Sequence, residues 1–316
     1  VTFQGGRFIQ NQIPNSSSVI ATMLLIKKSI NAVDFNDSKF INNEGGSTGL
    51  IMISEITNED QSSGCHLDIH NVTMVENGAG SGAITTAQGI WDLSGESSFT
   101  TCIANSEFKD NNTSGYLVYN RILSVLKIVD QTKISGNIAK ALIQIDDCSS
   151  DSEFYMNGNV EFVGNNSLSS GILLKSRGEL TTLDFKNVSF RSNQAFGLLD
   201  AIINVKAATL PKETSIFDTV EFLKNKSGLV RFEGVGGRLT IQNSRFEENY
   251  LSDSPAFIHM KETGNELLIR KTTFLKNTGK FPLDLYLLNG GQSCHGRGEK
   301  PSSLEVLNQS VLAQID

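Results

Sequence analysis

Hydrophobic and polar residues alternate in short runs along this chain. Apolar residues stand two apart at Val33 and Phe35 and again at Leu67 and Ile69, and the same pairs recur throughout the sequence. Period-two alternation is typical of a strand with one buried face. No segment shows the sustained 3.6-residue period of a long amphipathic helix. The pattern therefore predicts an all-β protein made of many short strands.

A four-residue motif, Phe-x-x-Asn, begins five residues after the last residue of each apolar pair. Successive copies start 24 to 34 residues apart, and in two copies Met74 and Ile134 replace the Phe. A repeat of this length indicates a solenoid, in which each unit stacks on its neighbours. The strict copies pair Phe8 with Asn11, Phe40 with Asn43, Phe108 with Asn111, Phe162 with Asn165, Phe190 with Asn193, Phe222 with Asn225, Phe246 with Asn249 and Phe274 with Asn277.

One repeat unit has the composition of one turn of a β-helix: a strand, a tight turn, a short strand with the Phe, a turn with the Asn, and a third strand. We predict a right-handed parallel β-helix of about ten to eleven coils, forming a single domain over residues 1–316. Like positions of neighbouring coils then stack at about 4.8 Å. The Phe rings should form one column, and the Asn side chains should form a ladder of hydrogen bonds.

The motif also carries a resemblance. Phe-x-x-Asn followed by a strand such as Gly80–Ile84 resembles the repeats of chlamydial polymorphic membrane proteins, which are surface adhesins, and those of pectin-lyase-like surface proteins of protists. The strict copies cover residues 8 to 277. This resemblance implies a β-helix, a surface location and adhesion. Because the chain opens within a motif and without Met, we expect a mature protein or a segment of a longer one.

Composition and motifs limit which partners and cofactors the protein is expected to bind. The formal net charge of −7 disfavours nucleic acid, because phosphate binding needs clustered Lys and Arg. The longest apolar run, Val19–Ile26, is too short to span a bilayer as a helix. No phosphate-binding loop opens a helix, so we expect no cofactor. Without a Cys-x-x-Cys pair we expect no metal site.

The four cysteines leave two readings open. Cys65 and Cys102 fall near the same wall in neighbouring coils, so a bridge between them is one reading, although a three-residue offset must be absorbed by the loop. Four separate thiols are the other reading. Cys148 and Cys294 belong to distant coils and should not meet.

Many pectin-lyase-like proteins cleave polysaccharides, so the acids and histidines are the candidates for enzyme chemistry. The candidate carboxylates are Asp130, Asp146, Asp147, Asp151 and Asp184, yet adjacent Asp146 and Asp147 would point to opposite faces of a strand. We interpret them as solvated loop acids.

The histidines do not suggest a site either. His295 lies in a Gly-rich stretch that we predict to be an exposed loop. His66 and His70 have a metal-like spacing but lie outside a helix, and His259 should face solvent on its strand.

Several Asn-x-Ser/Thr sequons occur, and the repeat sorts them. Asn111, Asn165 and Asn225 hold the ladder position, where an inward side chain could not carry a glycan. We predict glycosylation in the turn before the Phe instead, at Asn36, Asn71, Asn187 and Asn308.

Together these features favour a non-enzymatic, extracellular structural or adhesive protein of a cell-surface or fibrous assembly. Its expected partners are other copies or neighbouring segments, end to end, and glycans. The alternative is a carbohydrate-active enzyme, either a polysaccharide lyase or a glycoside hydrolase, or a sugar-binding module.

Overall fold

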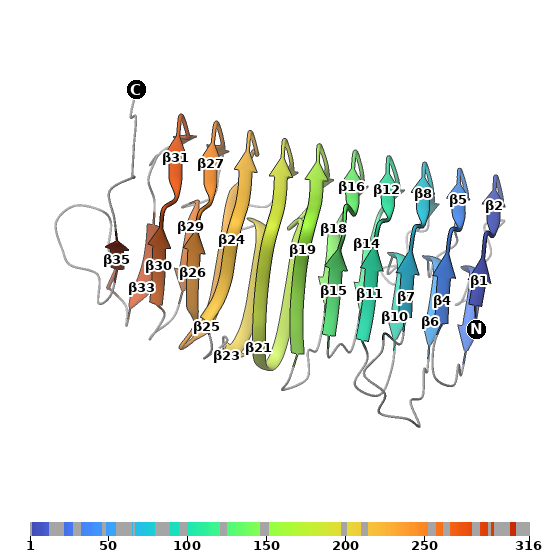
Figure 1. Cartoon of the computed structure of the whole chain (residues 1–316), viewed down its shortest axis with the longest axis horizontal. Coiled ribbons are helices and arrows are strands. Elements are labelled where there is room, and N and C mark those ends of the chain that lie inside the picture. Colours follow the sequence, from blue (N-terminus) through green and yellow to red (C-terminus); the bar gives the residue numbers. More distant parts are fainter. Residues whose placement is uncertain are drawn as a thin grey trace.

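A computed structural model of the chain describes residues 2–12, 22–27, 33–45, 49–54, 65, 67–79, 89–94, 100–120, 125–145, 152–196, 201–209, 214–251, 257–261, 266–279, 285–289, 292–293 and 304–307. These residues form strands and turns, and no helix occurs among them. The strands stack into an elongated rod with β1 (Thr2–Gln4) and β35 (Leu304–Leu307) at opposite ends (Figure 1). The strands nearest the viewer run upward while the chain advances from right to left, so the predicted right-handed parallel β-helix is confirmed.

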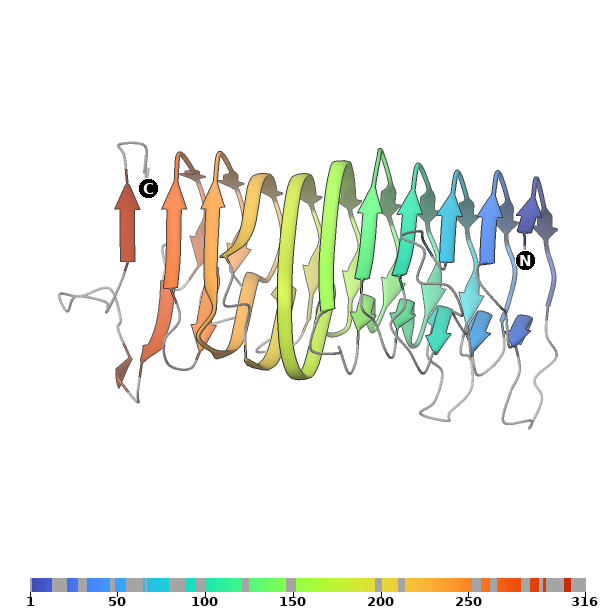
Figure 2. The ribbon, with the colours of Figure 1, turned by 60° about the horizontal axis from the view of Figure 1, so that its bottom comes forward.

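The coil has three walls, which we call the long, narrow and rear walls (Figures 1 and 2). The long wall has two halves separated by a turn. Its first half contains β1 (Thr2–Gln4), β4 (Val33–Asn36), β7 (Leu67–His70), β11 (Thr100–Ala104), β15 (Val125–Val129), β26 (Arg238–Gln242), β30 (Glu266–Arg270) and β35 (Leu304–Leu307). Its second half contains β2 (Arg7–Ile9), β5 (Lys39–Ile41), β8 (Thr73–Val75), β12 (Glu107–Lys109), β16 (Lys133–Ser135), β27 (Arg245–Glu247) and β31 (Thr273–Leu275).

Some strands run through more than one part of the coil. Both halves of the long wall are crossed by β19 (Ser152–Val163), β24 (Thr214–Leu223) and β21 (Ile172–Arg191), the last of which starts in the rear wall. The narrow wall contains β9 (Gly78–Ala79), β13 (Asn112–Thr113), β17 (Ile138–Ala139), β20 (Asn166–Ser167), β22 (Gln194–Ala195), β28 (Tyr250–Leu251) and β32 (Thr278–Gly279).

The rear wall completes the coil. It contains β3 (Thr22–Lys27), β6 (Gly49–Ser54), β10 (Gly89–Ser94), β14 (Tyr116–Asn120), β18 (Ala141–Ile145), β23 (Ala201–Thr209), β25 (Gly228–Val235), β29 (Ile258–Lys261) and β33 (Leu285–Asn289). Pairing between neighbouring coils is parallel in all three walls. Only the short pair of β33 with β34 (Gln292–Ser293) is antiparallel among the described strands.

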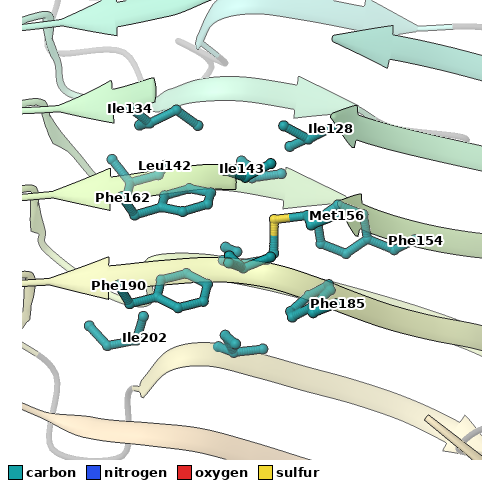
Figure 3. Close-up of a cluster of buried hydrophobic side chains, with 14 of the residues drawn as sticks. Ile128, Ile134, Leu142, Ile143, Phe154, Met156, Phe162, Phe185, Phe190 and Ile202 are labelled. Atoms are coloured by element: carbon teal, nitrogen blue, oxygen red, sulfur yellow. The ribbon is translucent and has the colours of Figure 1, made fainter. Parts of the chain in front are cut away.

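The apolar motif residues form one buried column. Phe8 pairs with Phe40 in register, and the same position pairs coil by coil as far as Phe246 and Phe274. Rings in adjacent coils stack with centroids 4.6 to 5.0 Å apart. Each fully buried ring contributes on the order of 2–3 kcal/mol. The column faces aliphatic residues of the rear wall across the interior, as Phe162 faces Leu142 in Figure 3.

Two residues in each coil turn the chain inward with a left-handed backbone. One stands three residues before the Phe position, as Asn71 and Asn187 do, and the other directly precedes the ladder Asn. Most of these positions are not glycine, and Asn and Asp tolerate this conformation better than other residues. The bends are therefore built into fixed positions of the repeat.

The motif asparagines form a continuous hydrogen-bonded ladder along the narrow side of the interior. Asn111 donates from Nδ2 to the Asn137 Oδ1 of the next coil (2.9 Å) and to the Met74 carbonyl of the preceding coil (3.0 Å). Its own Oδ1 accepts from the backbone N and Nδ2 of Asn77. The same bonds recur from Asn11 to Asn277. Each amide thus satisfies buried polar groups in both neighbouring coils.

The ladder predicts a sharp difference between two adjacent residues. Asn111→Ala should destabilise the protein by about 1–3 kcal/mol, because it leaves buried donors and acceptors of Asn77, Asn137 and Met74 unpaired. Asn112 is exposed in the narrow wall, so Asn112→Ala should change stability by less than about 0.5 kcal/mol. Urea unfolding of both variants measures the difference. Equal losses would contradict the ladder's role.

Candidate functional site

The turn asparagines and the ladder asparagines differ in exposure. Asn71 and Asn187 are exposed in left-handed turn positions of the long wall. Asn36 ends β4 and is partly exposed, and Asn308 lies outside the described residues. By contrast, ladder residues Asn165 and Asn225 are both 0% exposed. A glycan can therefore leave the first group without displacing the core, and it cannot leave the second.

A disulfide joins two neighbouring coils on the long wall. Cys102 lies in β11, and Cys65 precedes β7 by two residues. The two are bonded, with their Cα atoms 5.8 Å apart. The loop that the bond closes spans one full coil. Cys148 and Cys294 lie outside the described residues.

Of the acids singled out from the sequence, the structure describes Asp130 and Asp184, which lie two coils apart. Asp130 is exposed in a left-handed turn. Asp184 lies within β21, where the Lys186 ammonium is 3.0 Å from its Oδ2. Asp146, Asp147 and Asp151 lie outside the described residues.

The histidines show one error of the sequence analysis. His259 was expected to face solvent on β29, but it is buried, with 6% of its surface exposed. His70 is exposed at the end of β7, and the Nδ2 of Asn105 lies 3.2 Å from its Nε2. His66 and His295 lie outside the described residues.

The burial of His259 belongs to a wider feature of the rear wall. Outward positions in successive coils are occupied by Gln144, Leu173, Asn204, Arg231 and His259, and none is more than 6% exposed. The Asn204 Nδ2 donates to the Ser170 hydroxyl at 3.0 Å. Strand alternation predicts that these side chains point away from the core, but not that they are covered.

A pair of carboxylates on the long wall was missed. Asp34 in β4 and Asp68 in β7 occupy the same outward position of adjacent parallel strands. The Thr2 hydroxyl donates to Asp34 at 3.0 Å. Burial, and then the charge of Asp34, raise the pKa of Asp68, and His70 partly offsets this. Both acids precede their motif by six residues, which is the signal that could have found them.

Asp218 on the same wall has the opposite environment. Partial burial alone would raise its pKa, but hydrogen bonds from Asn243, Gln242 and Thr219 outweigh that effect and lower the pKa of Asp218. The Asn243 Nδ2 and Gln242 Nε2 donate at 2.8 and 2.9 Å. On the long wall, therefore, the surroundings of Asp68 disfavour its charged form and those of Asp218 favour it.

Two features are absent from the described part of the chain. Among these residues, no three His, Cys, Asp or Glu side chains are placed to hold a metal ion together. The described residues also contain no helix that is long and apolar enough to cross a membrane.

Comparison with protein-family models, with characterised proteins and with solved structures finds no match to this chain. The structure therefore defines its class: a parallel β-solenoid with asparagine and phenylalanine columns.

The two carboxylates predict opposite pH responses. Because the folded-state pKa of Asp68 is raised, its charge destabilises the fold at neutral pH, and the effect disappears as pH falls to the ordinary carboxyl range near about 4. Asp68→Asn should raise stability at pH 7 by roughly a few tenths of a kcal/mol, since solvent screens this site.

Asp218→Asn is the control, because its effect on stability at neutral pH should have the opposite sign. The lowered pKa of Asp218 contributes stability above the ordinary carboxyl pKa, which is lost as pH falls through its folded-state value. Thermal unfolding at neutral and acidic pH checks both variants. A pH-independent effect of Asp68→Asn, or a loss of stability at neutral pH, would contradict the assignment.

Proposed function

We propose that this chain is a non-enzymatic, extracellular structural or adhesive β-helix that forms part of a cell-surface or fibrous assembly. The observation that carries the proposal is the ladder, which continues from Asn11 to Asn277 through every intervening coil. Such a column makes a stiff rod whose outward residues are free to vary.

Two further observations support this reading. The Phe-x-x-Asn repeat resembles those of chlamydial polymorphic membrane proteins and of pectin-lyase-like protist surface proteins. The Cys65–Cys102 disulfide fits an oxidising compartment, such as the cell exterior.

The proposed partners are other copies or neighbouring segments that join end to end, together with glycans. Phe3 and Phe8 in the first described coil are only partly buried, although their stacking partners Phe35 and Phe40 are completely buried. A further coil placed on this end would cover the remaining ring faces.

End-to-end joining can be tested by electron microscopy of the purified protein over a range of concentrations. We expect rods that lengthen with concentration. Phe8→Glu should shorten them, because it puts a charge on the joining face, whereas Ile9→Glu changes an outward residue and should not. Single rods at every concentration would contradict the proposal.

Secretion from a glycosylating eukaryotic host tests the proposed location and the glycan positions together. Peptide mapping should find glycans at Asn36, Asn71, Asn187 and Asn308, because these turn positions can reach solvent, and none at the ladder position. Glycosylated Asn165 beside unmodified Asn71 and Asn187 would contradict the map.

The second candidate is a carbohydrate-active protein, and the paired Asp34 and Asp68 favour it. Acid–base cleavage of a sugar chain commonly uses two neighbouring carboxyl groups, one of which has a raised pKa, as Asp68 does. Incubation with a panel of polysaccharides distinguishes the two functions. Release of sugar products that Asp68→Asn abolishes would replace the structural proposal with this one.

A further inference from the structure

One edge of the rod carries most of the exposed apolar side chains. Five large hydrophobic residues are exposed in the described part of the chain, and four of them, Ile138, Leu168, Phe196 and Tyr250, lie on or beside the narrow wall. Leu168 and Phe196 are 59% and 54% exposed. Exposed apolar residues gathered in this way usually mark a contact surface.

Charged residues flank this apolar group in a fixed order. We define the narrow-wall strip as the exposed residues of the narrow wall and of the turn before it, which runs along the upper edge of Figure 1. The charged and large apolar residues of the strip are Glu44, Glu76, Asp110, Ile138, Lys140, Leu168, Phe196, Lys224, Lys226, Glu248, Tyr250 and Lys276. Along the rod the end nearer the N-terminus is acidic, the centre is mainly apolar, and the end nearer the C-terminus is mainly basic.

The order is symmetric about Leu168. Its motif residue is Phe162, and the preceding and following coils provide Ile138 and Phe196. One coil further out, Asp110 stands on one side and Lys226 on the other. Two coils beyond these stand Glu44, directly after its ladder Asn, and Lys276, directly before its own.

A second copy turned end over end would set the acidic end of the strip opposite its basic end. A twofold axis through Leu168 would place Leu168 near its own counterpart and bring the coil of Ile138 opposite the coil of Phe196. The same rotation would bring the coil of Asp110 opposite that of Lys226 and the coil of Glu44 opposite that of Lys276. Such self-complementarity is what a twofold contact requires, and an apolar centre with a charged rim is the usual composition of an interface.

One like-charge contact opposes this pairing, and an ion pair within the chain partly compensates it. Glu76 would face the coil of Glu248, but the Glu248 carboxylate is already 3.3 Å from the Lys224 ammonium of its own chain. Lys140 lies over the Tyr116 ring, 5.6 Å from its centroid, beside the apolar centre. From Glu44 to Lys276 the strip covers eight strand spacings, about 40 Å.

We propose that two copies of this chain associate side by side and antiparallel through the narrow-wall strip. This contact deepens the proposed structural function, on which it rests for its role, by naming a lateral partner besides the end-to-end one. The dimer should weaken with rising salt, because its rim is ionic.

Sedimentation velocity of the whole protein, at increasing concentration and at low ionic strength, measures the dimer directly. Leu168→Asp should weaken association by roughly tenfold or more, because it places two carboxylates together on the axis. Ile9→Asp is the matched control: Ile9 is 47% exposed but lies on the long wall. It should dimerise as the parent protein does.

Charge exchange tests the antiparallel direction. Lys226→Glu alone should weaken the dimer, because it would face Asp110, and adding Asp110→Lys to the same chain should restore it. Disulfide crosslinking is an independent readout. The Leu168→Cys variant should readily form a disulfide between two copies, whereas the Ile9→Cys variant should not.

The outcomes separate the two proposals. The antiparallel pair would be overturned if the parent protein forms no side-by-side dimer. It would also be overturned if Asp110→Lys does not repair the association defect of Lys226→Glu. Rods that still join end to end in that case would leave the proposed function standing. Cleavage of a polysaccharide by a dimeric protein would instead overturn the function and leave the pair intact.

Discussion

The amide-to-amide hydrogen bond of the asparagine ladder is the interaction on which this structure depends. A parallel stack turns its backbone inward at the same place in every coil, and buried polar groups at that bend must find partners. Asn137 and Asn165 satisfy them by donating from Nδ2 to both neighbouring coils. The Oδ1 of Asn165 accepts from the backbone N and the Nδ2 of Asn137. The aromatic column then fills the space beside the ladder at the same spacing.

Because the ladder and the aromatic column occupy only a few positions of each coil, coils of different length can share one core. Starts of successive motifs are 24 to 34 residues apart, yet Phe190 still lies over Phe162 and Phe222 over Phe190. Length differences are absorbed in the connections outside the motif, where loop closure costs grow only slowly with length. Register is therefore set by a few residues per coil, and the remainder of each coil is free to diverge.

The difference between the repeated core positions and the variable remainder of each coil decides what could be predicted from the sequence. The fold was predictable because its core repeats one motif, so that each Phe and Asn identifies the others. Asp34 and Asp68 were missed because the next coil has Cys102 at their position, and two members do not make a visible repeat. The burial of Arg231 and His259 was missed for another reason: alternation gives the direction of a side chain but not what covers it.

The ladder also gives the rod a direction. From Asn11 to Asn249, each ladder asparagine donates from Nδ2 to the Oδ1 of its C-terminal neighbour. The amide dipoles are thus aligned, as peptide dipoles are along a helix. The two ends of the rod are electrically distinct, so copies joined end to end keep one polarity along a fibre, while two rods lying antiparallel cancel their dipoles.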